Sequence, residues 1–235
     1  AEWGEPVVGG SLKYAGGTDP ADFVPQEGHG FDGPQFMPIY NALLRIDPWV
    51  GLDSVLEGDV AESWSMSDDF LTMSVTLRDE VYFQTNDNLP ESVTGVSGDQ
   101  LVCEDVKASL EFFQDPGEYV PTMKDEGAAI SHMESVTCPD GGRGLTMELV
   151  FNEGLARTVR NFAVMDGNPN IMDKDYIDWN GNRGEMVFKL KESTPETFLW
   201  SLGTGAFIPV EYEPDIKTVL ARNPTYFREG LPFLD

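Results

Sequence analysis

Alternation of apolar and polar residues predicts two antiparallel hairpins. Apolar residues occupy every second position of Leu71–Leu77, between threonine and serine, which is typical of a strand with one buried face. Asp68-Asp69 marks a turn before this strand, so we expect Val60–Met66 to pair with it. The same arrangement recurs where Met133–Cys138 and Leu145–Phe151 flank a glycine-rich turn. The pattern therefore predicts a sheet built from hairpins.

The remaining segments predict helices, short strands and loops. Apolar residues recur at helical spacing in three segments, Pro38–Ile46, Glu104–Phe113 and 156–165. Further strands are expected at Ser11–Ala15, Val81–Phe83, Phe207–Glu213 and Lys217–Arg222, with Val81–Phe83 continuing the sheet. Residues 84–99 and 166–184 are polar and without a period, so we expect loops there. The overall pattern is that of a mixed α+β fold.

Composition indicates a folded and strongly acidic protein. The chain has 235 residues, of which 40% are hydrophobic, enough for the core of one large domain or two small ones. Its 15 Lys and Arg against 41 Asp and Glu give a net charge of −26. Such a surface repels a phosphate backbone and anionic lipid, so nucleic acid is not an expected partner. We interpret the charge as solubilising, in particular where salt screens self-repulsion, with a specific cationic partner as the alternative.

The start of the sequence fits an exported protein. No stretch approaches the roughly 20 apolar residues needed to span a bilayer. Residues Ala1–Gly4 contain no initiator methionine and no basic or apolar region of a signal peptide. We therefore expect a mature N-terminus left by cleavage, or a trimmed one.

The two cysteines, Cys103 and Cys138, suit one disulfide in an exported protein. Such a bond would close a loop of about 35 residues and stabilise the fold by about 3–4 kcal/mol. Two buried free thiols are the alternative. A metal site is not expected, because neither cysteine has a second Cys or a His at ligand spacing.

The sequence offers no catalytic constellation. His29 and His132 are expected in different subdomains, and the chain has no G-x-S-x-G motif. With 41 acidic residues, close carboxylate pairs arise by chance. Residues Asp178–Gly184 resemble a calcium loop, but Arg183 and Lys189 stand where glycine and glutamate are required. We therefore expect no catalytic residue, no metal and no cofactor, and hence not an enzyme.

Several segments carry a family resemblance in a consistent order. They read VAESWSMSDD, LRDEVYF, EDVKASL, GTGAF, EYEP and RNPTYFREGLPFLD, at Val60–Asp69, Leu77–Phe83, Glu104–Leu110, Gly203–Phe207, Glu211–Pro214 and Arg222–Asp235. Together they resemble extracytoplasmic solute-binding proteins of the oligopeptide, dipeptide and nickel ABC-transporter class, known as family 5. The sequence departs from the family pattern at Val102, Cys103 and Ala206, where Thr, Ala and Pro are usual, and residues 94–98 lengthen a loop. These departures leave the particular ligand open.

The resemblance implies a periplasmic-binding-protein-like lobe with a mixed sheet. Proteins of this class have two lobes that close on a ligand, and the chain crosses to the second lobe shortly after the segment that ends at Asp235. The sequence thus looks like the N-terminal lobe, with the second lobe in the same gene or on a separate chain. Residues 1–48 and 185–235 are expected to form subdomain Ia, the central sheet of the lobe, and residues 49–184 subdomain Ib.

Two segments are candidates for ligand contact. Gly17, Thr18 and Asp19 follow a predicted strand and correspond to the cleft rim in the family; Asp19 could meet an ammonium group or belong to a turn with the following proline. Phe23 is expected either to line the apolar wall or to pack the loop, and the same holds for Phe36.

The second segment, Gly203, Thr204, Gly205 and Phe207, lies near the cleft in the family, where a hinge or packing role is the alternative to ligand contact.

The resemblance implies the substrate-binding component of an ABC importer. Such a protein captures a peptide or other small solute outside the membrane and delivers it to the permease subunits. It would be periplasmic or extracellular, and attached to the membrane through the transporter or a lipid anchor where it is attached at all. The alternatives are a structural or interaction module that keeps the lobe fold without transport, and a secreted hydrolase.

Overall fold

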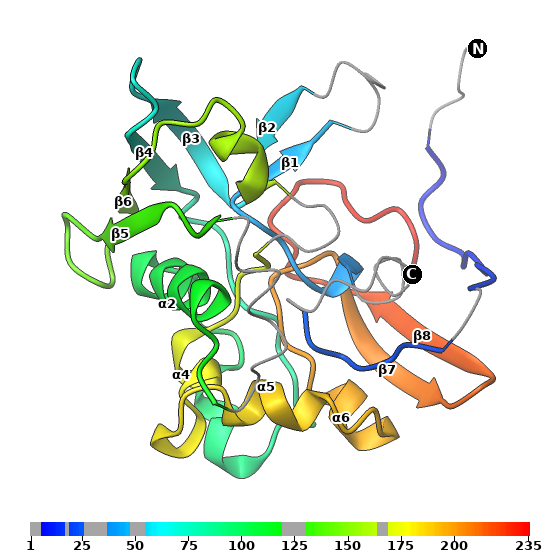
Figure 1. Cartoon of the computed structure of the whole chain (residues 1–235). Helices are drawn as coiled ribbons and strands as arrows, with labels where there is room; N and C mark the ends of the chain where they lie inside the picture. Colours follow the sequence, from blue (N-terminus) through cyan, green and yellow to red (C-terminus); the bar gives the residue numbers. More distant parts are fainter. Residues whose placement is uncertain (1–5, 17–18, 26–36, 48–54, 119–129, 164–168) are drawn as a thin grey trace.

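The structure of the protein is a computed structural model that describes residues 6–16, 19–25, 37–47, 55–118, 130–163 and 169–235. A four-stranded sheet lies at one end of the molecule, and the hairpin of β7 and β8 lies at the other (Figure 1). Between them run α2 and the short helices α4, α5 and α6. The fold is thus mixed α and β with antiparallel sheets, as expected.

The four-stranded sheet confirms both predicted hairpins. Its strands are β3 (Ala61–Met66), β4 (Thr72–Leu77), β6 (Thr146–Phe151) and β5 (Met133–Thr137), antiparallel and in that spatial order. Val75 at the centre of β4 lies opposite Trp64 on one side and Met147 on the other. Every second residue of β4 and β6 is buried, whereas Ser74 and Glu148 are exposed; the buried residues are Met73, Val75, Leu77, Met147, Leu149 and Phe151. The alternation in the sequence thus marks the buried face.

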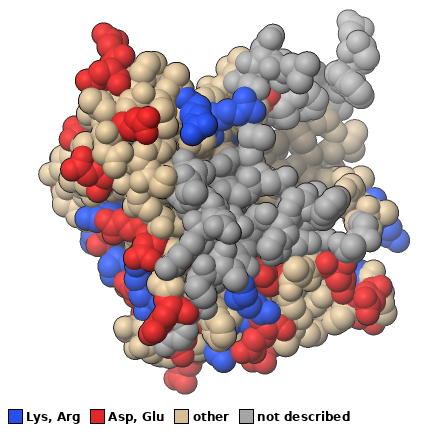
Figure 2. All heavy atoms as spheres, viewed as in Figure 1, with Lys and Arg blue, Asp and Glu red and all other residues tan. Residues whose placement is uncertain are grey.

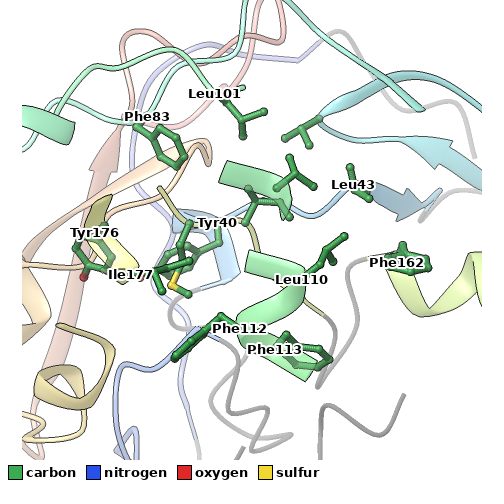
Figure 3. Packing of buried hydrophobic residues seen from close by; sticks show 14 of the residues in the cluster. Tyr40, Leu43, Phe83, Leu101, Leu110, Phe112, Phe113, Phe162, Tyr176 and Ile177 are labelled. Carbon is green, nitrogen blue, oxygen red and sulfur yellow. The ribbon is translucent and has the colours of Figure 1, made fainter. Parts of the chain in front are cut away.

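Helix α2 (Cys103–Gln114) packs its apolar side into the core, as its spacing predicts. Leu110, Phe112 and Phe113 are fully buried, and Figure 3 shows them projecting from this helix. Burying a side chain of this size contributes about 1.5–3 kcal/mol. The core continues from the sheet through α2 to Tyr176 and Ile177 in α4 (Lys174–Ile177).

Two buried carboxyl groups connect the starts of α2 and α4. Val102 supplies no side-chain acceptor at the N-cap of α2, as expected from its apolar side chain. Asp105 compensates, because its Oδ2 accepts from the Val102 amide at 2.9 Å while its Oδ1 accepts from the Lys174 amide at 3.0 Å. Asp173 caps α4 by accepting from two backbone amides of its first turn.

Burial raises the pKa of both carboxyl groups. The pKa of Asp105 rises to about 6, mainly through loss of solvent. The pKa of Asp173 rises to about 7, through burial and the neighbouring negative charge of Asp105. Near neutral pH the pair therefore exerts a destabilising electrostatic effect within the core.

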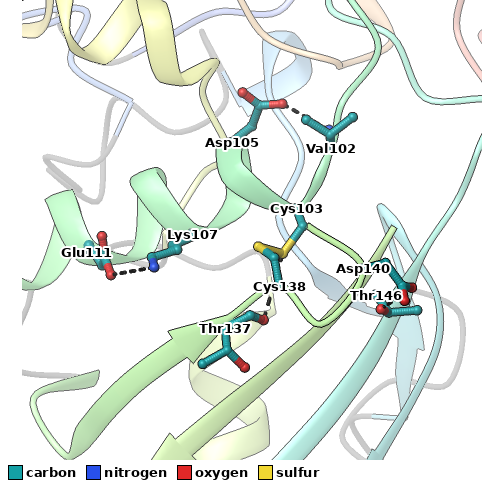
Figure 4. Close-up of a disulfide and its surroundings, with 9 residues drawn as sticks. All are labelled: Val102, Cys103, Asp105, Lys107, Glu111, Thr137, Cys138, Asp140 and Thr146. Atoms are coloured by element: carbon teal, nitrogen blue, oxygen red, sulfur yellow. Dashed lines mark hydrogen bonds and ion pairs between the residues drawn. A yellow bond between two sulfur atoms is a disulfide. The ribbon is translucent and has the colours of Figure 1, made fainter. Parts of the chain in front are cut away.

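The disulfide between Cys103 and Cys138 is present, which confirms the pairing over two free thiols. It joins the start of α2 to the residue after β5 (Figure 4). Two further backbone hydrogen bonds hold the same junction, from Cys103 N to Gly144 O and from Glu104 N to Gly142 O, each 2.9 Å. The helix is thus anchored to the β5–β6 turn by a covalent bond and by main-chain contacts.

The other end of the molecule contains a third confirmed strand pair. β7 (Phe207–Glu213) and β8 (Lys217–Arg222) form an antiparallel hairpin whose turn has Asp215 at φ 61°. Helices α5 (Glu185–Leu190) and α6 (Pro195–Leu199) precede it, and the sequence analysis did not predict either. A further antiparallel pair, of β1 (Leu44–Ile46) and β2 (Leu56–Gly58), joins residues on both sides of position 48, the expected subdomain boundary.

The expected helix at Pro38–Ile46 is wrong. Only Met37–Ile39 forms a turn of 3₁₀ helix, and the chain then runs extended into β1. The residues between the 3₁₀ turn and β1 are buried on all sides, so the spacing of apolar positions does not distinguish a helix from extended chain here. The amide of Ala42 donates to the Asp59 carboxylate at 3.2 Å, which replaces a helical backbone bond.

Other local expectations are also corrected. Ser11–Ala15 is exposed and forms no strand, and Val81–Phe83 contributes an isolated bridge from Tyr82 to Gln100 rather than a strand of the sheet. The expected helix at 156–165 is a 3₁₀ segment over Thr158–Phe162. The expected loops contain short helices that the pattern missed, at Glu91–Val96, Lys174–Ile177 and Trp179–Gly181.

Acidic side chains are spread over the face that Figure 2 shows, with lysine and arginine among them. None of the helices in the described part of the chain has the length and apolar character that a bilayer crossing requires.

Replacing both cysteines with serine is expected to lower the free energy of unfolding by about 3–4 kcal/mol, because the unfolded chain regains the entropy of the closed loop. Urea denaturation of the variant beside the oxidised wild type measures this. Dithiothreitol should reproduce most of the loss in the wild type and leave the variant unchanged. An unchanged midpoint after reduction of the wild type would contradict the prediction.

The buried acid pair predicts a stability that falls as pH rises. Because the folded pKa of Asp173 lies near 7, above its ordinary value of 3.8, the folded state binds more protons and loses stability between about pH 4 and pH 7. Asp173→Asn keeps a capping oxygen and removes the charge, so its melting temperature at pH 8 should exceed that of the wild type. Its advantage should shrink towards pH 4. Asp68→Asn, at an exposed turn, serves as the control and should show neither effect.

Candidate functional site

Two distant segments of backbone cross in close contact at the centre of the molecule. The amide of Gly205 donates to the carbonyl of Ile39 at 2.8 Å. A Cβ on Gly203 would lie 2.2 Å from Ile39 O, and one on Gly205 would lie 2.3 Å from Pro38 O. Any side chain at either glycine would force the segments apart. The glycines are thus required by packing.

The side chain of Gln84 is hydrogen-bonded to both crossing segments. Its Nε2 group, fully buried, is shared among the carbonyls of Ile39 (3.2 Å), Gly205 (3.0 Å) and Phe207 (2.7 Å). The backbone amide of Gln84 donates to Gly203 O at 2.9 Å. Asn223 adds a further bond to Gly205 O at 2.8 Å. One side chain therefore ties together the two crossing segments and the start of β7; we call this arrangement the Gln84 clamp.

A buried polar network adjoins the clamp. Asp59, 3% exposed, accepts from Asn41 Nδ2 at 2.9 Å and from Arg228 Nη2 at 3.0 Å. Thr204 Oγ1 in turn donates to Asn41 Oδ1 at 3.0 Å. Arg228 also stacks over the ring of Phe227, 5.2 Å from its centroid. A charge pair this well buried and hydrogen-bonded fixes its partners in place.

A shallow depression of 290 Å³ opens above this network. Its lining includes Met37, Tyr40, Asn41, Arg45, Ala206 and Tyr226. The lining thus combines apolar and aromatic side chains with the polar and charged groups of Asn41, Arg45 and Asp59. Arg45 is held by an ion pair with Glu57 at 2.8 Å. Burial and the nearby charge of Asp59 raise the pKa of Tyr226, so this hydroxyl stays protonated as a donor.

A second group surrounds Tyr212 in β7. Asp19 Oδ2 accepts from Tyr212 Oη at 3.1 Å and from the Asp215 amide at 2.6 Å. Phe23 is fully buried, with its ring centroid 5.0 Å from those of Tyr212 and Phe198. Burial and the Asp19 carboxylate raise the pKa of Tyr212 to about 12. These contacts fasten the segment around residues 19–23 to the β7–β8 hairpin.

The structure thus places the predicted site residues in two groups along β7. Gly203, Thr204, Gly205 and Phe207 meet at the clamp and beneath the depression, whereas Asp19 and Phe23 meet at Tyr212. Gly17, Thr18 and Phe36 lie outside the described residues. Sequence reasoning missed Gln84, Asn41 and Asp59, which stand in no periodic pattern or motif of their own. Arg228 and Tyr226 were within a family-like segment but had no assigned role.

No group of three or more His, Cys, Asp or Glu in the described ranges is arranged to hold a metal ion. His132, the histidine in those ranges, bonds through Nε2 to Thr158 Oγ1 at 2.8 Å and stacks on Phe151. Burial lowers its pKa, which favours a neutral imidazole within the core.

Comparison with known families matches residues 55–235 to the bacterial extracellular solute-binding proteins, family 5, middle part. The chain belongs to this family. The resemblance seen in the sequence is thereby confirmed. Members of family 5 are binding proteins that act in the periplasm or outside the cell. A comparison with curated protein sequences gives no match.

Solved structures confirm the periplasmic-binding-protein fold for this family 5 chain. It is similar to the ABC transporter-associated protein DppA from Helicobacter pylori in complex with the peptide STSA, at 26% identity and a TM-score of 0.73, over 97% of this chain and 42% of that one. AppA from Bacillus subtilis, an oligopeptide-binding protein in complex with a nonapeptide, has 19% identity and a TM-score of 0.69, over 98% of this chain and 40% of AppA. NikZ from Campylobacter jejuni in complex with Ni(L-His) has 17% identity and a TM-score of 0.62, over 94% of this chain and 36% of NikZ. The chain spans about two fifths of the length of DppA and AppA.

The backbone crossing predicts that Gly205→Ala destabilises the protein. The added Cβ would lie 2.3–2.6 Å from the backbone of Pro38 and Ile39, so the clamp must open, and we expect a loss of about 2–4 kcal/mol in the free energy of unfolding. Gly95→Ala is the matched control, because its Cβ meets no neighbour within 4 Å. Chemical denaturation compares the two; equal stabilities would show that the crossing is not tightly packed.

Proposed function

We propose that this chain is the first lobe of a receptor that captures a peptide or other small solute outside the membrane and delivers it to an ABC permease. Membership in family 5 over residues 55–235 carries the proposal. The resemblance to DppA, which was solved with a bound peptide, extends over nearly the whole chain. A receptor of this kind works by closing two lobes on its ligand, and the permease recognises the closed form.

The proposed division of the lobe keeps residues 1–48 and 185–235 together as subdomain Ia, with residues 49–184 as subdomain Ib. The four-stranded sheet falls entirely within the second range, and the β7–β8 hairpin entirely within the first. Apolar side chains of subdomain Ia are exposed at Val7, Leu12, Tyr14, Val210 and Ile216. Exposed apolar surface of this kind supports a larger protein in which further chain covers it.

The depression beside the Gln84 clamp is the proposed part of the ligand cleft on this lobe. Ala206 in its lining directly follows the Gly203–Gly205 segment. Tyr226 offers apolar area and a hydroxyl, which suits a peptide side chain or another small organic group, whereas the hydroxyl of Tyr40 is buried beneath the lining. Gly17, Thr18 and Asp19 remain the proposed rim, where the Asp19 carboxylate faces solvent as well as Tyr212.

Titration of the full-length protein with peptide pools tests this function. Isothermal calorimetry should detect saturable binding, and Ala206→Trp, which fills the depression, should weaken it by at least about tenfold, equal to about 1.4 kcal/mol. Ser135→Trp adds similar bulk at an exposed position of β5 that lines neither this depression nor the one on the four-stranded sheet, and it should bind like the wild type.

The outcomes separate the function from its site. A full-length protein that binds neither peptides nor other small solutes would overturn the receptor function in favour of a structural module. Binding that survives Ala206→Trp unchanged would place the ligand away from the depression.

A further inference from the structure

Residues near the start of the chain meet the last residues of the sequence. The Gly9 amide donates to Phe233 O at 2.7 Å, and the Asp235 amide donates to Gly10 O at 3.0 Å. Both glycines have positive φ, 99° and 87°, a left-handed conformation that other residues adopt only with strain. The two segments are thus joined in a geometry that depends on consecutive glycines.

Arg222, the last residue of β8, holds this junction against the hairpin. Its Nε donates to Leu234 O at 2.9 Å, and its Nη2 donates to Phe233 O at 3.0 Å and to Asp235 Oδ1 at 3.0 Å. The second carboxylate oxygen of Asp235 accepts from the Gly10 amide at 2.9 Å. The Asp235 side chain therefore bridges β8 and the N-terminal segment. We call Arg222, Asp235, Gly9 and Gly10 the exit latch.

The exit latch is one ladder rung away from the candidate site. Arg222 pairs with Phe207 across the β7–β8 ladder, and the Phe207 carbonyl is bound by Gln84. The next residue, Asn223, donates to Gly205 O. Arg222 is thus connected to the Gln84 clamp through the β7–β8 ladder and two side-chain hydrogen bonds to backbone carbonyls.

We propose that Arg222 is a positioning residue, which sets the direction in which the chain leaves this lobe and couples that direction to the ligand site. The coupling to ligand rests on the proposed function, in which residues after 235 lead towards a second lobe. Asp235 is mostly exposed, with 71% of its side chain accessible, so its ion pair with Arg222 is weak enough to break and re-form. A joint of this kind suits a hinge, in which a few residues at the ends of elements take up the motion.

Arg222→Gln in the full-length protein tests the latch. Hydrogen exchange followed by mass spectrometry, without ligand, should show about tenfold faster exchange in peptides covering residues 6–16 and 229–235, because local opening becomes easier. Exchange in β4 should not change. Arg222→Lys keeps the charge opposite Asp235 but loses the planar set of donors, so it should rescue the exchange rate only in part.

Lys217→Gln provides the control, since it removes another ion pair of the same strand, with Glu211 at 2.8 Å. Exchange at residues 6–16 and 229–235 that is equal in Arg222→Gln and Lys217→Gln would overturn the latch. Small-angle scattering of ligand-free protein adds a second readout, in which Arg222→Gln should change the radius of gyration and Lys217→Gln should not.

Measurement of peptide binding distinguishes the proposed receptor function from the proposed positioning role of Arg222. If the wild type binds peptide, Arg222→Gln should change the dissociation constant by at least about threefold through the open–closed equilibrium, and an unchanged constant would overturn the coupling. If the wild type binds no ligand but the exchange rates respond as expected, the receptor function fails while the positioning role of Arg222 stands.

Discussion

The contact between Gly205 and Ile39 brings together parts of the chain that are far apart in sequence. Gln84 completes it, and its carbonyl partners at Ile39 and Gly205 are 45 and 121 residues away along the chain. Because this side chain is fully buried, each of these carbonyls has exchanged water for the same amide group. The position of β7 relative to the buried segment around Ile39 follows from this one arrangement. The depression, the Thr204–Asn41 hydrogen bond and the exit latch all depend on β7 and its neighbours.

Acidic side chains are stabilised by different means on the surface and in the interior of this protein. Its surface carries most of a net charge of −26, which salt can screen. Inside, Asp59 is paired with Arg228 and bonded by Asn41, whereas burial raises the pKa values of Asp105 and Asp173. The first arrangement fixes the side chains around the candidate site through an ion pair and hydrogen bonds. The second links two helix starts and makes the stability of this region depend on protonation.

Periodicity predicted the elements with one buried face. The hairpins of the four-stranded sheet, α2 and the β7–β8 hairpin were all predicted from alternation or helical spacing. The pattern failed at Pro38–Ile46, where burial on all sides removes the difference between helix and extended chain. It also missed α5 and α6, each only one or two turns long. Gly203 and Gly205 were found because they belong to a family-like segment, whereas Gln84 acts through contacts so distant in sequence that no local pattern reveals it.

The order of strands in the four-stranded sheet bears on how the lobe assembles. Two of its ladders, β3–β4 and β5–β6, join neighbours in sequence, and only β4–β6 connects distant segments. Each hairpin can form by local contacts within microseconds, whereas joining them requires closure of a long loop that includes α2. Until β6 docks, β4 presents an unpaired edge. The β4–β6 ladder is therefore the pairing of this sheet that waits on loop closure, and until it forms the edge of β4 stays open to another chain.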